Sequence, residues 1–138
     1  MLDLKSQNFK VGMYIRLSRE DGDKQESESI GNQRNILQRY VKENDLCFVK
    51  EYVDDGVSGT TFDRPGFNEM LQDIENKNIN MVITKDLSRL GRDYIKTGFY
   101  IEDYFPKNNV RYVAITDGID TYLDLSLIHI SEPTRLQL

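Results

Sequence analysis

Residues 10–18 read KVGMYIRLS, a largely apolar run that ends in an arginine and a serine. Its apolar density is typical of a strand buried on both faces of a parallel sheet, rather than of one that alternates between core and solvent. We therefore predict a buried strand from Lys10 to Leu17. If the extended backbone persists through Ser18, Arg16 and Ser18 lie on the same face, because side chains two apart on a strand do so. Both can then address one ligand.

Further apolar runs follow this strand in alternation with segments of helical spacing. Strands are predicted over residues 46–53, 80–84 and 110–116. Helices are predicted from Ser29, as N-cap, to about Asn44, from Pro65 onward, and after a turn at Lys85 up to Pro106. The alternation predicts an α/β fold: a mostly parallel central sheet of about four strands with helices on both faces. In such sheets, functional sites lie at the carboxyl ends of the strands.

Two polar segments begin at strand ends. Residues 18–28 read SREDGDKQESE, and residues 54–66 read DDGVSGTTFDRPG. Both compositions predict loops, and the second is rich in turn-forming residues. Loops of this length inside a compact domain are usually functional.

The bulk properties are those of one soluble globular domain. The chain has 138 residues, 38% of them apolar and 30% charged. Its apolar runs are shorter than the roughly 18 residues of a membrane span, and its N-terminus lacks a signal-peptide pattern, so a cytoplasmic protein without a membrane partner is expected. The single cysteine, Cys47, stands among apolar neighbours and is expected to pack as a small hydrophobic residue.

The arginines carry the main chemical signal. A net charge of -5 argues against a domain that mainly grips a nucleic-acid backbone, but not against one that acts on it. Arg16, Arg64, Arg89 and Arg92 are all expected at one sheet edge, the last two sharing a face if their segment is helical. Arginine forks bind phosphate, and they stabilise the charge that grows in a phosphoryl-transfer transition state. A serine beside them is a candidate nucleophile.

Four motifs occur in order: YIRLS (14–18), ESIGNQR (28–34), DDGVSGTTFDRPGF (54–67) and KDLSRLGRD (85–93). With these motifs, residues 10–122 resemble the catalytic domain of the serine recombinases, the resolvase and invertase family. The similarity is greatest to the large members that integrate or transpose mobile elements. The resemblance implies a resolvase-like fold, DNA as substrate, and self-association into dimers and a synaptic tetramer.

The resemblance also implies roles for individual residues. It makes Ser18 the nucleophile, which forms a 5′-phosphoserine bond to DNA and frees a 3′ hydroxyl before strand exchange and religation. No metal, nucleotide or other cofactor is implied. Many small resolvases have an aspartate where this chain has Ser88, so the general base stays open between Asp55 and Asp86. The implied active-site residues are Ser18, Arg16, Gln33, Asp55, Arg64, Arg89 and Arg92.

Two other functions fit parts of the sequence. A metal-dependent phosphoesterase or nuclease could use Glu51, Asp54 and Asp55 as oxygen ligands. A non-catalytic interaction module of flavodoxin-like architecture would need none of the candidate residues. Nucleotide binding is not favoured, because no glycine-rich phosphate loop follows the first strand.

The last residues have a different character. Residues 125–135, LSLIHISEPTR, resemble a translated sequencing adapter, so we expect a catalytic domain over residues 1–124 and a non-native tail over 125–138. His129, the only histidine, falls in this tail, which leaves no histidine for catalysis or metal binding. The family continues into a long dimerisation helix beyond about Tyr122. The chain alone is therefore expected to fold but not to recombine DNA.

Overall fold

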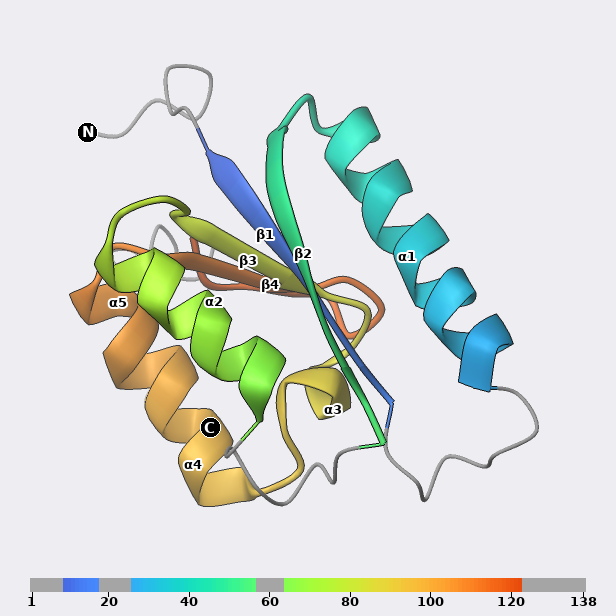
Figure 1. Ribbon diagram of the computed structural model, residues 1–138. Coiled ribbons are helices and arrows are strands. Elements are labelled where there is room, and N and C mark those ends of the chain that lie inside the picture. Colours follow the sequence, from blue (N-terminus) through green and yellow to red (C-terminus); the bar gives the residue numbers. More distant parts are fainter. Residues whose placement is uncertain (1–8, 18–25, 57–63, 123–138) are drawn as a thin grey trace.

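A computed structural model describes residues 9–17, 26–56 and 64–122 of the chain. It has the predicted α/β architecture, with helices on both faces of one sheet (Figure 1). The elements follow in the order β1 (Lys10–Leu17), α1 (Glu26–Glu43), β2 (Cys47–Asp55), α2 (Pro65–Glu75), β3 (Met81–Thr84), α3 (Leu87–Leu90), α4 (Tyr94–Phe99), the π-helical segment η3 (Tyr100–Tyr104), α5 (Phe105–Lys107), β4 (Arg111–Ala114) and β5 (Ile119–Asp120).

The sheet has the strand order β2-β1-β3-β4-β5. The first four strands pair in parallel, and β5 adds an antiparallel edge to β4. The prediction of a mostly parallel sheet is thus confirmed, while the fifth strand was not predicted. Two residues are too short to leave a periodic pattern in the sequence.

The inner strand β1 packs on both faces, as its apolar run predicts. Helix α1 covers one face, and α2, α4 and α5 cover the other (Figure 1). Every residue of β1 from Val11 to Leu17 is buried. The cluster on the α1 side includes Val11, Met13, Ile15 and Leu37.

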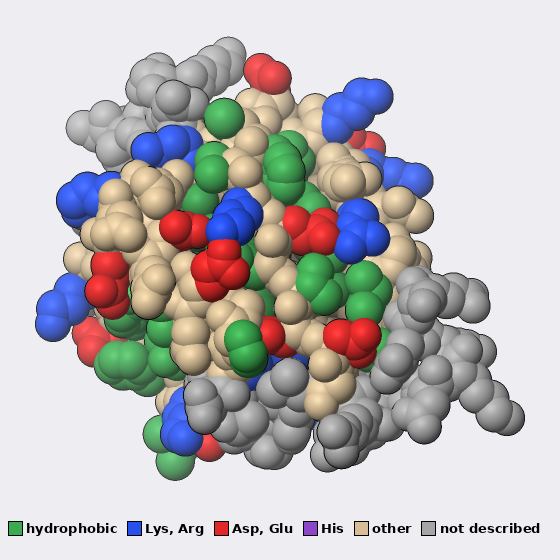
Figure 2. Space-filling model, in the orientation of Figure 1, with side chains coloured by type: hydrophobic (Ala, Val, Ile, Leu, Met, Phe, Trp, Pro, Cys, Tyr) green, Lys and Arg blue, Asp and Glu red, His purple; other side chains and the backbone are tan. Residues whose placement is uncertain are grey.

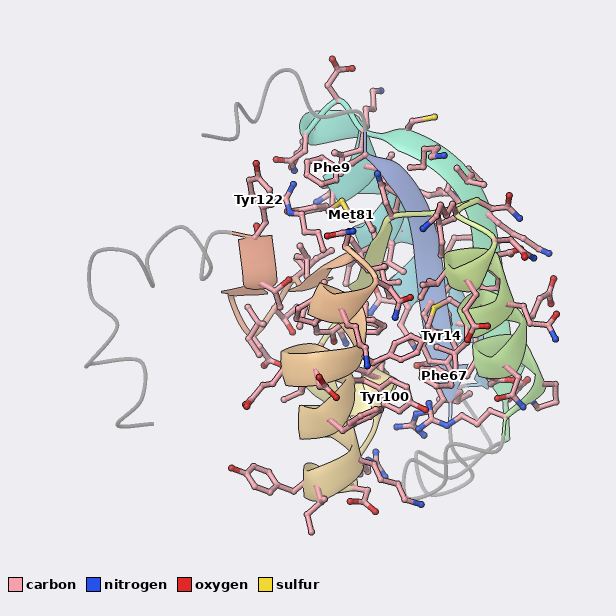
Figure 3. The ribbon with its side chains drawn as sticks, turned by 90° about the vertical axis from the view of Figure 1, so that its left-hand side faces the viewer. Phe9, Tyr14, Phe67, Met81, Tyr100 and Tyr122 are labelled. Atoms are coloured by element: carbon pink, nitrogen blue, oxygen red, sulfur yellow. The ribbon has the colours of Figure 1, made fainter. Side chains whose placement is uncertain are left out.

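The opposite face of the sheet carries an aromatic layer. Tyr14 of β1 meets Phe67 of α2 with ring centroids 5.7 Å apart, and Phe67 meets Tyr100 at 5.1 Å, both edge to face. Figure 3 shows these three side chains grouped between the sheet and the helices. Edge-to-face pairs are favourable because the positive ring edge meets the negative ring face. This layer is where the strand that carries Arg16 is anchored to α2.

Two boundaries differ from the predictions. Helix α1 begins at Glu26, so Ser29 lies inside the helix and is not its N-cap. Strand β2 continues through Asp55, so Asp54 and Asp55 belong to the sheet rather than to a loop. They extend the parallel ladder opposite Arg16 and Leu17, and this pairing overrides the turn preference of the two aspartates.

The segment after β3 is a set of short helices rather than one. Helix α3 ends at Leu90 with Gly91 as C-cap, and Asp93 caps α4 by accepting hydrogen bonds from the amides of Ile95 and Lys96. Arg92 therefore lies outside α3, so the helical segment on which Arg89 and Arg92 would share a face is not formed. The helical run also continues through Pro106 to Lys107 instead of stopping there.

Cys47 is exposed, so the prediction that it packs in the core is wrong. It begins the edge strand β2, whose first residues are left largely uncovered. In the three described stretches, no helix combines the length and the apolar character that crossing a bilayer requires.

The buried tyrosines predict a loss of stability in alkali. Burial is the main cause that raises the pKa of Tyr14 and Tyr112, and it raises the pKa of Tyr104 to about 12. A tyrosine in the unfolded chain ionises near pH 10, so above that pH the unfolded state binds fewer protons than the folded state. We therefore expect the free energy of unfolding to fall as the pH rises from about 10 through 12.

Urea unfolding at a series of pH values, with tyrosinate absorbance as the second readout, measures this slope. Tyr112→Phe should make the slope shallower, whereas Tyr94→Phe should leave it unchanged because Tyr94 is 90% exposed. Ionisation of all tyrosines in the folded protein near pH 10, without loss of stability, would contradict the expectation.

Candidate active site

The candidate site lies where β1 and β2 end, beside the short helix α3 (Figure 1). Arg16 is fully buried there. Its Nη2 donates a hydrogen bond to the carbonyl oxygen of Ser88 at 2.6 Å, and its Nε donates to that of Arg89 at 3.2 Å. Helix α3 thus holds the guanidinium of the first candidate arginine.

Arg64 is the second buried guanidinium, and it binds the same helix. Its Nη1 donates to the carbonyl oxygen of Leu90 at 2.8 Å and to the Tyr14 hydroxyl at 3.0 Å. Three consecutive carbonyls of α3 therefore accept from two arginines. The last carbonyls of a helix have no partner within the helix, so they are suited to this task.

The other two arginines complete a cluster. Arg89 Nη1 donates to the backbone oxygen of Arg16 at 3.2 Å, and Arg92 is exposed. The pKa of Arg16 is lowered to about 10, first by burial and then by the positive charges of Arg64, Arg92 and Arg89. Arg16 is thus close enough to each of the other three predicted arginines to feel their positive charge. An anion between them would relieve that repulsion.

Gln33 reaches the same strand end from α1. It is fully buried, and its Nε2 donates to the backbone oxygen of Arg16 at 3.3 Å. Its Oε1 is buried without a hydrogen-bond partner among the described residues. The glutamine therefore lies at the end of β1, where the chain leads to Ser18.

Of the remaining predicted residues, the structure describes the two aspartates but not the serine. Ser18 lies outside the described residues, as does His129. Asp55 ends β2 opposite Leu17 and is exposed. Asp86 caps α3, with Oδ1 accepting from the Ser88 hydroxyl at 2.5 Å and from the Arg89 amide at 3.2 Å. Both aspartates thus border the site.

The site also includes Tyr14, which was not predicted, and Asp54, which was predicted only as a possible metal ligand. The Tyr14 hydroxyl donates to Asp54 Oδ2 at 2.8 Å while it accepts from Arg64. Asp54 also accepts from the amides of Gly66 at 2.8 Å and Phe67 at 2.9 Å, which caps the start of α2. The signal for Tyr14 was present in the sequence, because it lies two residues before Arg16 and so on the same face.

A glycine permits this cap. A Cβ at Gly66 would lie 2.9 Å from Asp54 Oδ2 and 3.0 Å from Oδ1, closer than carbon and oxygen tolerate. Glycine in the RPG sequence therefore lets the carboxylate approach the helix amides. Packing against Asp54, and not contact with a substrate, therefore accounts for Gly66 in this motif.

The carboxylates proposed as metal ligands do not form one site. Asp54 accepts the three hydrogen bonds above, whereas Glu51 binds both nitrogens of the Arg34 fork at 2.8 and 2.7 Å. Successive side chains alternate along β2, so Glu51 and Asp55 lie on the face opposite Asp54. Among residues 9–17, 26–56 and 64–122, no group of three or more His, Cys, Asp or Glu side chains could hold a metal ion.

The surface charge is mixed. On the face drawn in Figure 2, Lys and Arg side chains are interspersed with Asp and Glu, and apolar side chains lie between them. Lys50 and Glu69 form one exposed ion pair. The arginine cluster is therefore a local concentration of positive charge in a chain of net charge -5.

The comparisons with a family model and with solved structures agree with one another. The family model for the resolvase N-terminal domain matches residues 11–130. The chain is similar to the N-terminal catalytic domain of TP901-1 integrase, with 28% identity, a TM-score of 0.74, and coverage of 93% of this chain and 95% of that one. It is also similar to a resolvase family site-specific recombinase from Streptococcus pneumoniae, with 26% identity, a TM-score of 0.67, and coverage of 94% and 92%. A serine recombinase from Sulfolobus solfataricus matches with 25% identity, a TM-score of 0.62, and coverage of 88% and 79%.

Proposed function

Because the chain belongs to the resolvase N-terminal domain family, we propose that it is the catalytic domain of a serine-type DNA recombinase whose nucleophile is Ser18. Site-specific recombination is the general activity of the family. The observation that carries the proposal is the cluster of four arginines at the end of β1, two of them buried and held by α3. The chain reaches Ser18 directly after this strand.

The reaction is a phosphoryl transfer in two steps. The Ser18 hydroxyl oxygen attacks phosphorus, an O–P bond to serine forms, and the bond from phosphorus to the 3′ oxygen breaks. The 3′ oxygen takes up a proton from solvent and leaves as a hydroxyl, and the serine proton goes to a base, for which Asp55 and Asp86 are the candidates. Attack by a 3′ hydroxyl on the phosphoserine reverses the step and reseals DNA, so no ATP is consumed.

The arginines supply electrostatic stabilisation in this scheme. The pentacovalent transition state carries more negative charge than the phosphodiester, so fixed cations lower its energy more than that of the ground state. Arg16 and Arg64 are already immobilised, and little reorganisation is required of them. Arg92 is exposed and so accessible to a phosphate. The proposed substrate is DNA, and further copies of the chain in a dimer and a synaptic tetramer are the proposed partners.

The test uses a small activated substrate, because a net charge of -5 gives no reason to expect tight DNA binding. Thymidine 5′-(p-nitrophenyl) phosphate presents the same 5′-linked phosphodiester with a good leaving group. With a chelator present, the protein should release at most one equivalent of p-nitrophenolate and gain one thymidylyl group. Mass spectrometry of the peptides should place that group on Ser18. Transfer to another residue, dependence on a divalent ion, or absence of transfer would overturn the proposal.

A further inference from the structure

Helix α3 accepts hydrogen bonds from the two buried arginines, but it is too short to be stable without contacts to the rest of the fold. It has four residues, and isolated helices shorter than about 12–15 residues are marginal in water. Its carbonyls accept from Arg16 and Arg64. The contacts that fasten the start of α3 therefore decide where both guanidiniums lie.

One of these contacts comes from the turn between β4 and β5. Asp117 Oδ2 accepts a hydrogen bond from the amide of Leu87, the first residue of α3, at 2.6 Å. Asp86, next to the helix, accepts from the Arg89 amide at 3.2 Å. The first turn of α3 is thus held by one carboxylate from its own segment and one from 30 residues further along the chain.

Backbone hydrogen bonds fix the turn that carries Asp117. The Ile115 amide donates to the Thr84 oxygen at 3.1 Å, and the Thr116 amide donates to the Lys85 oxygen at 2.8 Å, which extends the pairing of β4 with β3. Gly118 has a φ of +69°, a conformation that favours glycine, and its amide donates to the Ile115 oxygen at 3.2 Å. These bonds direct Asp117 at the start of α3.

We propose that Asp117 is a positioning residue of this active site: it fixes α3 and thereby the carbonyls that orient Arg16 and Arg64 toward the scissile phosphate. The catalytic part of this inference rests on the proposed function, whereas the positioning part does not. Asp117 needs no contact with DNA for this role.

Nuclear magnetic resonance can observe the positioning directly. The Nε–H of Arg16, bonded to the Arg89 oxygen, reports how firmly α3 is held. Asp117→Ala should speed the exchange of this proton and of the Leu87 amide with water about five-fold, the factor expected from one lost helix cap. Asp117→Asn keeps an oxygen acceptor of the same shape and should restore most of the protection. Thr116→Val removes a side-chain bond from the same turn to Lys85 rather than to α3, and should change neither proton.

The second readout is thymidylyl transfer by the same variants. Asp117→Ala should lower the maximal rate about five-fold with little change in the probe concentration at half-maximal rate, and Asp117→Asn should recover it. Unchanged Arg16 Nε–H exchange in Asp117→Ala, or equal effects of the alanine and asparagine variants, would overturn the inference. If the wild-type protein transfers no thymidylyl group, the proposed function fails while the exchange data still decide the role of Asp117. If Asp117→Ala does not fold, Asp117→Asn is compared with the wild-type protein instead. A marked loss of Arg16 Nε–H protection in a folded Asp117→Asn variant would contradict the proposed role of the oxygen acceptor.

Discussion

Replacing Ser18 with alanine is expected to abolish covalent transfer of a thymidylyl group or of DNA to the protein. Alanine has no hydroxyl oxygen, and arginine cannot replace it as the nucleophile, because guanidinium stays protonated and its nitrogens are not nucleophilic. The arginine cluster itself should be intact in the variant. The measurement is the release of p-nitrophenolate together with the mass of the protein, with wild-type protein in parallel.

Ser29→Ala is the matched control. Ser29 lies in α1, four residues before Gln33, and it is not the N-cap of the helix. Its loss should leave covalent transfer within about two-fold of wild type, since surface and half-buried substitutions away from special features have small effects. Transfer that persists in Ser18→Ala, or that disappears in Ser29→Ala, would assign the nucleophile elsewhere.

Replacing Asp54 with alanine is expected to cause the largest loss of stability. The side chain is 4% exposed and accepts hydrogen bonds from Tyr14, Gly66 and Phe67. Its removal leaves the amides of Gly66 and Phe67, at the start of α2, without their acceptor. It also removes the carboxylate that is linked to the buried Arg64 guanidinium through the Tyr14 hydroxyl. Removing one partner of a buried charged network costs about 3–5 kcal/mol. That is a large part of the roughly 5–15 kcal/mol that stabilises a typical domain.

Asp55→Ala is the control for this prediction. Asp55 is the next residue of β2, on the opposite face and exposed, so its loss should change the free energy of unfolding by less than about 0.5 kcal/mol. Asp54→Asn keeps the shape and one carbonyl oxygen, and should fall between the two. Urea unfolding of the three variants gives the order. Equal stability of Asp54→Ala and Asp55→Ala would show that the buried network does not hold α2.

Local patterns in the sequence predicted the elements whose stability is local or whose burial is complete. β1 spans Lys10–Leu17 as predicted, because a strand covered on both faces must be apolar throughout. Helix α2 begins at Pro65 as predicted, since the fixed φ of proline suits a first helical position. The four predicted arginines lie together because parallel strands bring their carboxyl ends to one edge. Membership in the family also follows from the order of the motifs.

Other features depend on partners far away in the chain. Local preference favours a turn at Asp54 and Asp55, but their pairing with β1 makes them part of strand β2. Asp54 becomes a helix cap only because folding brings α2 within reach of its oxygens. Cys47 is exposed because β2 is an edge strand, and the strand order is absent from any local pattern.

The sequence by itself therefore identified the four arginines and the strand, β1, that brings Arg16 to the edge of the sheet. The tertiary structure alone decided how they are held. Arg16 and Arg64 bind the carbonyls of a helix more than 20 residues away, and Asp117 fastens that helix from the next strand connection. Hydrogen bonds between distant segments depend on how the whole chain packs, so no local period or spacing in the sequence indicates them.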